Sequence, residues 1–176
     1  MKKTLFLDRD GVINRDDGYT YRPEDFHFID GVFEACRRFL DLGYHIVIVT
    51  NQSGIGRGYY SEAQFHRLNQ WMLAQFAEQR VSILDVFFCP HHPTAALASY
   101  KRVCDCRKPA PGMFLQAAQK HDIDLVASVM VGDNLSDMEA ASRAGITRRF
   151  LVGDKHSLSL LPDGVEYVPI LNDVNL

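Results

Sequence analysis

The sequence predicts an α/β fold in which helices cover a mainly parallel central sheet. Short apolar, β-branched segments alternate along the 176 residues with segments whose apolar side chains recur at helical spacing. Hydrophobic residues make up 47% and charged residues 23%, the balance of an ordinary globular protein. The length suffices for one full core and is short for two. We therefore expect a single domain over residues 1–176.

The first half of the chain supplies two expected strands and two expected helices. Residues 4–7 form a short apolar run, and residues 45–50 are β-branched almost throughout, as in a buried strand. Apolar side chains recur at helical spacing over residues 31–42. Ser61 and Gln64 form a capping-box pattern, which opens a helix that runs to about residue 79.

The second half continues the alternation after a strand at residues 83–88. A long loop over residues 89–109 leads to a helix that Pro111 opens and that ends near His121. A strand at 128–131, a helix at 135–144 stopped by Gly145, and strands at 150–152 and 167–168 follow. Ligands of such sheets bind beyond the carboxyl ends of the strands. This rule brings together the residues that follow or close strands, namely Asp8, Thr50, Cys89 and Asp133.

Charge and hydropathy exclude several classes of partner. The formal net charge is -3, and no basic excess or polybasic run favours nucleic acid or a membrane surface. Residues 1–3 lead straight into the first strand, without the apolar stretch of a signal peptide, and no apolar run approaches the roughly 20 residues that span a bilayer. We expect a cytoplasmic, monomeric protein that acts on a small molecule.

Asp8 and Asp10 place two carboxylates just past the first strand. Asp8 is suited to act as a nucleophile, and Asp10 as general acid and base. A carboxylate that attacks phosphorus forms an aspartyl-phosphate, which divides a difficult hydrolysis into two easier steps. Asp and Gly are also common in surface turns, so Asp8 and Asp10 taken alone indicate a surface turn rather than a catalytic site.

Three further groups at strand ends or helix starts point to the same chemistry. Residues 50–53 offer a hydroxyl and backbone N–H groups for phosphoryl oxygens, although Thr-Asn-Gln-Ser equally suits a turn. Lys108 precedes a Pro-started helix and is suited to neutralise phosphoryl charge; a solvated basic pair with Arg107 is the alternative. Asp133 and Asp137 suit Mg²⁺, or the ordinary start of a helix.

The four groups in this order resemble the motif set of the haloacid dehalogenase superfamily, from Asp8 to Asp137. The resemblance implies that Asp8 is the nucleophile and a Mg²⁺ ligand. It makes Asp10 the acid and base, with its carbonyl on the metal. Thr50 would bind the transferring phosphoryl group, and Lys108 would neutralise it and the nucleophile.

The same resemblance completes the metal site. It implies that Asp133 is the main acidic Mg²⁺ ligand, that Asn134 assists in the metal shell, and that Asp137 supports the site from further out. An aspartate at position 10 suits a phosphatase, because it can protonate an alkoxide leaving group and then activate water.

A cluster of thiols lies in the long loop. Cys89, His91, Cys104 and Cys106 suit a closed, structural tetrahedral Zn²⁺ site, with His92 as the competing imidazole. The alternative is a loop of free thiols. The fourth cysteine, Cys36, lies in an apolar helical pattern and is expected in the core. A metal clamp here would fix Lys108, because Cys104 and Cys106 lead directly into Arg107 and Lys108.

This loop narrows the resemblance to a group of the superfamily that contains phosphatases of heptose bisphosphates and of histidinol phosphate. The likeness is closer to the heptose branch, at residues 8–14, 28–32, 51–58 and 89–113. It implies a compact, Rossmann-like three-layer sandwich with no large cap domain. The residues that it implies for substrate binding are Asp16, Asp17, Gly18, Tyr19, Thr50, Asn51, Gln52, Ser53, Arg107 and Lys108. Arg107 suits a second phosphate, because a guanidinium pairs with it bidentately.

The expected activity is therefore Mg²⁺-dependent removal of the 7-phosphate from a heptose 1,7-bisphosphate. This reaction would serve the synthesis of ADP- or GDP-heptose for lipopolysaccharide and surface polysaccharide. The alternative of the same class is histidinol-phosphatase activity. The alternative of a different class is a zinc-stabilised binding module without catalysis.

Overall fold

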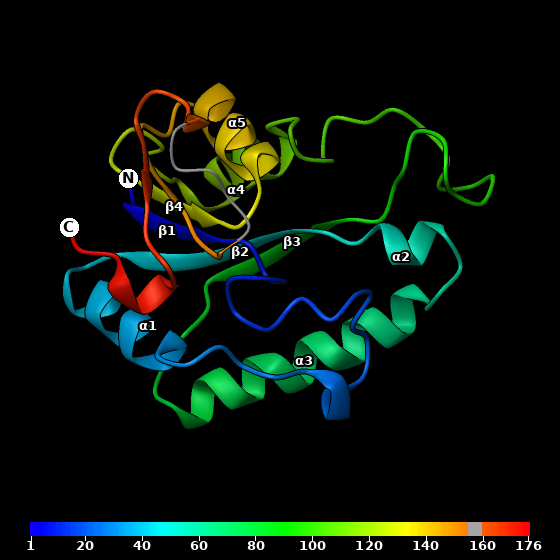
Figure 1. Ribbon diagram of the computed structural model, residues 1–176, viewed down its shortest axis with the longest axis horizontal. Helices are drawn as coiled ribbons and strands as arrows, with labels where there is room; N and C mark the ends of the chain where they lie inside the picture. The colour runs from blue at the N-terminus through cyan, green and yellow to red at the C-terminus, as the bar shows by residue number, and fades with distance from the viewer. Residues whose placement is uncertain (155–159) are drawn as a thin grey trace.

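The protein is built on a six-stranded sheet that is parallel throughout, as seen in a computed structural model that describes residues 1–154 and 160–176 (Figure 1). Its strands are β1 (Thr4–Leu7), β2 (His45–Asn51), β3 (Asp85–Cys89), β4 (Val129–Gly132), β5 (Arg148–Leu151) and β6 (Val165–Tyr167). They lie in the order β3-β2-β1-β4-β5-β6. The expected parallel α/β fold is confirmed.

The strand order places a topological switch point between β1 and β4. The chain moves outward from β1 to β2 and β3, then returns across β1 to β4 and continues to the other edge. The crevice outside the carboxyl ends of strands at such a point is where open α/β sheets bind ligands. Asp8 follows β1 and Asp133 follows β4, so both acids stand at this crevice.

Helices cover both faces of the sheet (Figure 1). The helices α1 (Val32–Asp41) and α3 (Glu62–Glu78) lie on one side, and α4 (Gly112–His121) and α5 (Leu135–Ala144) on the other. The central strands are buried on both faces because their side chains alternate between two apolar clusters. Leu5 and Leu7 face α1 and α3, whereas Phe6 between them faces α4 and α5.

Local signals set the helix ends close to their expected positions. Ser61 accepts a hydrogen bond from the backbone N–H of Gln64, and the Gln64 side chain accepts one from the Ser61 N–H, which completes the expected capping box of α3. Gly145 ends α5 in the left-handed conformation, with φ of 100°. Each expected strand lies within two or three residues of an observed one.

Two segments complete the surroundings of the site. The short helix α2 (Ser53–Gly56) follows β2, and the long loop after β3 passes near it at the right of Figure 1. The backbone N–H of Leu97 in that loop donates to the Gly56 carbonyl at 2.7 Å, which ties the two together. Turns of 3-10 helix occur at Pro23–Asp25 and Leu171–Asp173. Among the described residues, no helix combines the length and apolar character needed to cross a membrane.

Candidate active site

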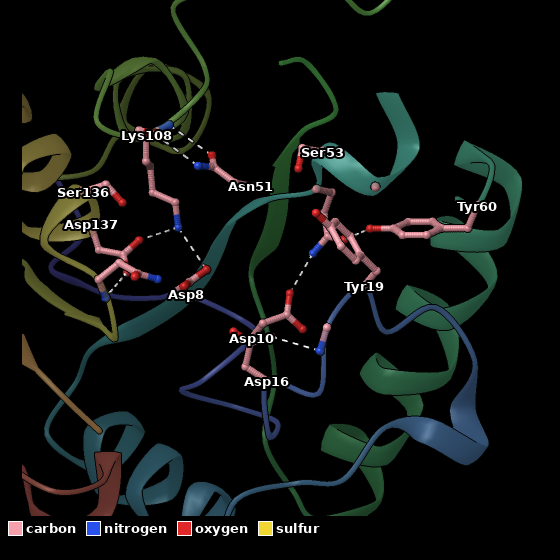
Figure 2. A pocket seen from close by; sticks show the side chains of 14 residues that line it. Asp8, Asp10, Asp16, Tyr19, Asn51, Ser53, Tyr60, Lys108, Ser136 and Asp137 are labelled. Carbon is pink, nitrogen blue, oxygen red and sulfur yellow. Dashed lines mark hydrogen bonds and ion pairs between the residues drawn. The ribbon is translucent and has the colours of Figure 1, made fainter. Parts of the chain in front are cut away.

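A cavity of about 350 Å³ opens at the carboxyl ends of β1, β2 and β4 (Figure 2). Its walls come from the segments after these strands, from α2 and from the start of α5. The lining residues are Asp8, Asp10, Asp16, Gly18, Tyr19, Asn51, Gln52, Ser53, Gly54, Tyr60, Lys108, Asn134, Ser136 and Asp137. The crevice at the switch point is thus an acidic cavity with one buried lysine.

Lys108 lies between two carboxylates at the base of the cavity. Its Nζ is 2.9 Å from Asp8 Oδ1 and 2.6 Å from Asp137 Oδ1, and it donates to the Val49 carbonyl at 2.9 Å. These three contacts use all three ammonium hydrogens. Burial by itself lowers the pKa of Lys108, but Asp137 and Asp8 outweigh it and hold that pKa above its usual value. Lys108 is therefore a fixed cation beside Asp8.

Asn51 sets the position of the Lys108 backbone. Its side-chain amide donates to the Lys108 carbonyl at 3.2 Å, and its Oδ1 accepts from the Lys108 N–H at 3.0 Å. The Lys108–Pro109 peptide bond is cis. Because Asn51 ends β2, this double contact fastens the long loop to the sheet at the residue that reaches Asp8.

Three buried carboxylates converge beside the lysine. One oxygen from each of Asp8, Asp133 and Asp137 lies within 4.8 Å of the others. Burial first, and then the charge of Asp137, raises the pKa of Asp8 well above its usual value, although Lys108 opposes this shift. One ammonium thus leaves an excess of negative charge, and a cluster of carboxylate oxygens with this excess fits a hard divalent cation such as Mg²⁺.

The backbone of Gly11 permits the approach of Asp133. Gly11 has φ of +88°, and a Cβ built there would lie 2.1 Å from Asp133 Oδ2. Asn134 donates to Asp133 Oδ1 at 2.9 Å through its side chain and to Asp137 Oδ2 at 3.1 Å through its backbone. Both oxygens of Asp137 are therefore engaged, one by Lys108 and one by Asn134.

Asp10 points away from Asp8 and into a separate hydrogen-bond network (Figure 2). Arg9, whose side chain is buried, pairs with Asp10 Oδ1 at 3.0 Å. Asn14 donates to Oδ1 at 2.9 Å, and Gln52 donates to Oδ2 at 3.2 Å. Gln52 also accepts a hydrogen bond from the Tyr60 hydroxyl. Three side chains from two segments, the loop after β1 and the residue after β2, therefore fix the orientation of this carboxylate.

Most of the substrate-binding residues expected from the sequence line the cavity, and three do not. Thr50 is buried behind the lining, where its hydroxyl accepts from Gln52 at 2.9 Å. Asp17 lines a neighbouring hollow with residues 18–21. Arg107 donates to the His91 carbonyl at 3.4 Å and is absent from the cavity wall. The substrate-binding roles of all ten residues stay predictions.

Several residues of the site were missed by the sequence analysis, namely Arg9, Asn14, Gly54, Tyr60 and Ser136. Arg9 is flanked by the two catalytic candidates, and this position is the only signal in the sequence that could have pointed to it. Tyr60 stands beside Tyr59, and no pattern separates the buried hydroxyl from its exposed neighbour.

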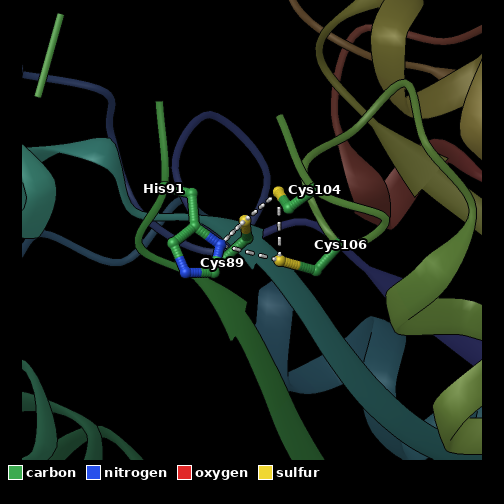
Figure 3. A group of neighbouring side chains, drawn as sticks. All are labelled: Cys89, His91, Cys104 and Cys106. Carbon is green, nitrogen blue, oxygen red and sulfur yellow. Dashed lines mark hydrogen bonds between the residues drawn. The ribbon is translucent and has the colours of Figure 1, made fainter. Parts of the chain in front are cut away.

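The thiols of the long loop form a compact cluster with one imidazole (Figure 3). The Cys104 sulfur is 3.5 Å from those of Cys89 and Cys106, and His91 Nδ1 is 3.6 Å from Cys89 and 3.4 Å from Cys106. Ligands of tetrahedral Zn²⁺ at about 2.3 Å for sulfur and 2.0 Å for nitrogen lie roughly 3.5–3.8 Å apart. The four side chains therefore have the spacing of a closed zinc site.

The competing imidazole, that of His92, makes hydrogen bonds elsewhere in the loop. Nδ1 of His92 accepts hydrogen bonds from the backbone N–H groups of Thr94 at 3.2 Å and Ala95 at 2.8 Å, which stabilises the next turn of the loop. The cluster is also close to the start of α4, because Gly112 donates to the Asp105 carbonyl at 2.8 Å. A Cβ at Gly112 would lie 2.1 Å from that oxygen.

The fold and the site define the class of the protein as a phosphoryl-transfer enzyme of the haloacid dehalogenase type, and comparison with known proteins agrees. Residues 105–172 match the HAD-hydrolase-like family. The chain is 52% identical over 151 residues to D-glycero-beta-D-manno-heptose-1,7-bisphosphate 7-phosphatase of Vibrio cholerae, covering 86% of this chain and 81% of the relative. The enzyme of the same name from Yersinia pestis is 49% identical over 148 residues, 84% of this chain and 79% of the relative.

A solved structure extends the likeness over nearly the whole chain. The D,D-heptose 1,7-bisphosphate phosphatase of B. bronchiseptica, complexed with magnesium and phosphate, superposes with a TM-score of 0.82 at 32% identity. The match covers 97% of this chain and 94% of that one. The chain therefore belongs to the haloacid dehalogenase superfamily and, within it, to the family of heptose-1,7-bisphosphate 7-phosphatases.

Proposed function

We propose that this protein removes the 7-phosphate of D-glycero-D-manno-heptose 1,7-bisphosphate, in the synthesis of nucleotide-activated heptose. The observation that carries this proposal is the convergence of Asp8, Asp133 and Asp137 at the switch point of the sheet, where Lys108 pairs with Asp8 and Asp137. About half of the residues are identical to those of relatives that bear this activity in their names, which supports the choice of substrate.

Asp8 is the proposed nucleophile. A carboxylate oxygen of Asp8 attacks the phosphorus, the bond from phosphorus to the sugar oxygen breaks, and an aspartyl-phosphate forms. Lys108, 2.9 Å from Asp8 Oδ1, offsets the negative charge that gathers on the phosphoryl oxygens. Thr50 and the backbone N–H groups at residues 51–53 are proposed to hold those oxygens.

Asp10 is the proposed general acid and base. It gives its proton to the departing sugar oxygen, and then takes a proton from a water molecule that attacks the aspartyl-phosphate. The second step breaks the bond between Asp8 and phosphorus and releases inorganic phosphate. Asp10 lies two residues from Asp8, and its side chain lines the same cavity, which supports this role.

We propose a set of ligands for each of the two metals. Asp8, Asp133, the carbonyl of Asp10 and the side chain of Asn134 would hold Mg²⁺, which would supply positive charge to the phosphoryl group. Asp137 would support this shell through Lys108 and Asn134. Cys89, His91, Cys104 and Cys106 would hold a structural Zn²⁺, because the four side chains leave no ligand position open for substrate.

The second phosphate of the substrate is assigned to Arg107. This residue directly precedes Lys108, and its hydrogen bond to the His91 carbonyl, at 3.4 Å, lies at the weak limit of such a bond. A guanidinium held so weakly can turn toward a phosphate and bind it with two N–H groups. Asp16, Asp17, Gly18 and Tyr19 are proposed to contact the sugar between the two phosphates.

We also propose a reducing compartment and a simple assembly. Three thiols gathered for a metal suit the cytoplasm, where cysteines stay reduced. A single phosphatase domain over residues 1–176 that works as a monomer is consistent with one sheet that carries all the described strands.

The test is a phosphate-release assay with Mg²⁺ over three substrates. These are the heptose 1,7-bisphosphate, the heptose 7-phosphate and histidinol phosphate, and the highest kcat/KM is expected for the bisphosphate. Asp8→Asn should abolish turnover without loss of fold by circular dichroism. Faster turnover of histidinol phosphate than of the heptose 1,7-bisphosphate would contradict the proposed substrate. Activity in Asp8→Asn would contradict the proposed mechanism.

A further inference from the structure

Tyr60 is a buried tyrosine whose ring forms part of the cavity wall. It is 4% exposed, and its ring stacks on Tyr21 with centroids 5.3 Å apart and planes at 12°. Ile55 and Phe65 pack in the same apolar cluster. Gly54 makes room for the ring, since a Cβ there would lie 2.3 Å from Tyr60 Cε1. The hydroxyl of Tyr60 is therefore held in a fixed place.

That hydroxyl determines which way the amide of Gln52 faces. Burial raises the pKa of Tyr60, so its hydroxyl stays protonated. It therefore donates a hydrogen bond to Gln52 Oε1. The Gln52 amide nitrogen must then face the opposite way, where it donates to Thr50 Oγ1 at 2.9 Å and Asp10 Oδ2 at 3.2 Å. A reversed amide would set its oxygen against the Asp10 carboxylate.

We propose that Tyr60 is a positioning residue that acts through Gln52 on the general acid Asp10. The contacts Tyr60–Gln52–Asp10 form a continuous chain from the apolar cluster to the carboxylate. Arg9 and Asn14 hold the same carboxylate from the other side. Tyr60 thereby fixes where Asp10 delivers its proton to the leaving oxygen, although it touches neither the phosphorus nor that oxygen.

This inference rests on the proposed phosphatase function and makes a claim that depends on the leaving group. An alkoxide leaving group needs a proton from Asp10 as its bond to phosphorus breaks. A p-nitrophenolate does not need one. General acid catalysis contributes about 10²- to 10⁴-fold, so partial misplacement of Asp10 should cost about 10-fold. The cost should appear in the kcat/KM of sugar phosphates and be nearly absent for p-nitrophenyl phosphate.

The experiment compares Tyr60→Phe with the wild-type enzyme on the heptose bisphosphate and on p-nitrophenyl phosphate. We expect kcat/KM to fall about 10-fold on the sugar, with KM little changed, and to stay within about twofold on the aryl ester. Tyr44→Phe is the matched control, because Tyr44 packs against Phe39 just before β2, at the end of that strand opposite to the cavity. It should leave both substrates unaffected.

A double-mutant cycle tests the route through Gln52. Gln52→Met removes the amide at nearly constant volume, and it should produce the same leaving-group-dependent loss by itself. The double variant should then be no slower than Gln52→Met, because two residues that act in series do not add. Gln52→Met also keeps the inference testable if Tyr60→Phe fails to fold.

Each contrary result has a distinct meaning. Equal losses on both substrates would mean general loosening of the site and would overturn the inference. A raised KM with unchanged kcat in Tyr60→Phe would mean that Tyr60 contacts the substrate, and it would overturn the inference. Additive losses in the double variant would mean that Tyr60 does not act through Gln52, and they would overturn it as well. A wild-type enzyme inactive on every phosphate ester would overturn the proposed function, and the inference with it.

Discussion

Gly11 has consequences at the scale of a single residue, because the site needs its missing side chain. An alanine there would meet Asp133 Oδ2 at 2.1 Å and Asp133 Cβ at 3.0 Å, so Asp133 would have to move. We expect Gly11→Ala to lower kcat by about 100-fold or more, since a misplacement of about 1 Å can cost this much. Steady-state kinetics with saturating Mg²⁺ measure it.

The control for Gly11→Ala separates the steric clash from the cost of the left-handed backbone. Gly145 also has positive φ, +100°, but a Cβ there would meet nothing within 4 Å. Gly145→Ala should lose about 1–2 kcal/mol of stability and keep its activity. If both variants keep their activity, Asp133 is not confined by this loop in the way described.

Arg107 carries a prediction about substrate choice. If it binds the second phosphate, Arg107→Ala loses charged hydrogen bonds worth about 1.5–3 kcal/mol, or roughly 10- to 100-fold in kcat/KM. This loss should appear with the heptose 1,7-bisphosphate and not with the 7-phosphate alone. Arg102→Ala removes an equal charge from the exposed part of the same loop and serves as the control. Equal losses on both substrates would contradict the assignment.

At the scale of an element, the long loop is predicted to be stabilised by its metal. Cys104→Ser should remove zinc, measured by elemental analysis, and lower the Tm by roughly 5 °C or more, because each kcal/mol is worth about 2–4 °C at this size. Activity should fall as well, since Lys108 follows the cluster by two residues from Cys106.

A cysteine outside the cluster supplies the control for the zinc loop. Cys36 is fully buried in α1, and burial raises the pKa of its thiol to about 12, so it stays a neutral core side chain. Cys36→Ala should keep the zinc content of the wild type. Full activity of Cys104→Ser without zinc would contradict the coupling between loop and active site.

A second element-scale contact joins the start of β3 to the end of α4. Asp85 Oδ2 lies 2.7 Å from Lys120 Nζ and 2.6 Å from His121 Nε2. Partial burial tends to raise the pKa of Asp85, but the hydrogen bonds from Lys120, His121 and the Val86 N–H outweigh it and lower that pKa below 3.8. The ionised carboxylate therefore stabilises the fold above its unfolded pKa.

The sign of that shift predicts how stability changes with pH. Asp85→Asn should lower the free energy of unfolding by about 1 kcal/mol at pH 7. The difference in the free energy of unfolding between the wild type and the variant should persist down to about pH 5. It should vanish as the pH falls below 3.8 and through the pKa of Asp85 in the folded protein. Urea titrations at several pH values measure it, with the exposed Asp163→Asn as control. A gap that widens in acid would contradict this account.

The elements themselves followed from local patterns in the sequence. The β-branched run of β2 and the capping box of α3 are signals that a few neighbouring residues determine, and both predictions are confirmed. The short helix α2 has no counterpart among the expected elements, because its four residues, Ser53–Gly56, carry no apolar periodicity. Its position depends on contacts with the long loop, such as that between Leu97 and Gly56.

At the scale of the whole molecule, the metal should act as a clamp between the two halves of the sheet. Asp8 follows β1 and Asp133 follows β4, so one ion would join both. Mg²⁺ at about 100 times its Kd should add about 2.7 kcal/mol of stability, or roughly 5–10 °C in Tm. Thermal unfolding with and without Mg²⁺ measures this shift, after chelation and reloading of zinc.

The variant Asp133→Asn tests whether this stabilisation by Mg²⁺ depends on Asp133. Asp133→Asn removes one of three buried carboxylates, whose mutual repulsion contributes to the raised pKa of Asp8. It should raise the Tm of the magnesium-free protein and abolish the increase with Mg²⁺. The exposed Asp41→Asn should change neither quantity. An unaltered Mg²⁺ shift in Asp133→Asn would contradict the assigned ligand.

Some residues of the site could be predicted from the rule that the carboxyl ends of parallel strands meet at one rim of the sheet. Asp8 and Asp133 meet because strand ends share one rim of the sheet, and Lys108 joins them from the loop that precedes α4. The direction of a side chain has no such local signal. Arg9 turns onto Asp10, Arg107 turns toward His91, and Tyr60 turns onto Gln52 because of packing between segments distant in sequence. These orientations required the three-dimensional structure.

The closed cluster of thiols and imidazole also separates the long loop into two parts with different freedom. Cys89, His91, Cys104 and Cys106 hold its two ends, and most residues between 93 and 103 are exposed. Insertions and exchanges are tolerated best at such exposed tips. The tip can therefore diverge in evolution, or receive a grafted segment in the laboratory, while Lys108 keeps its position.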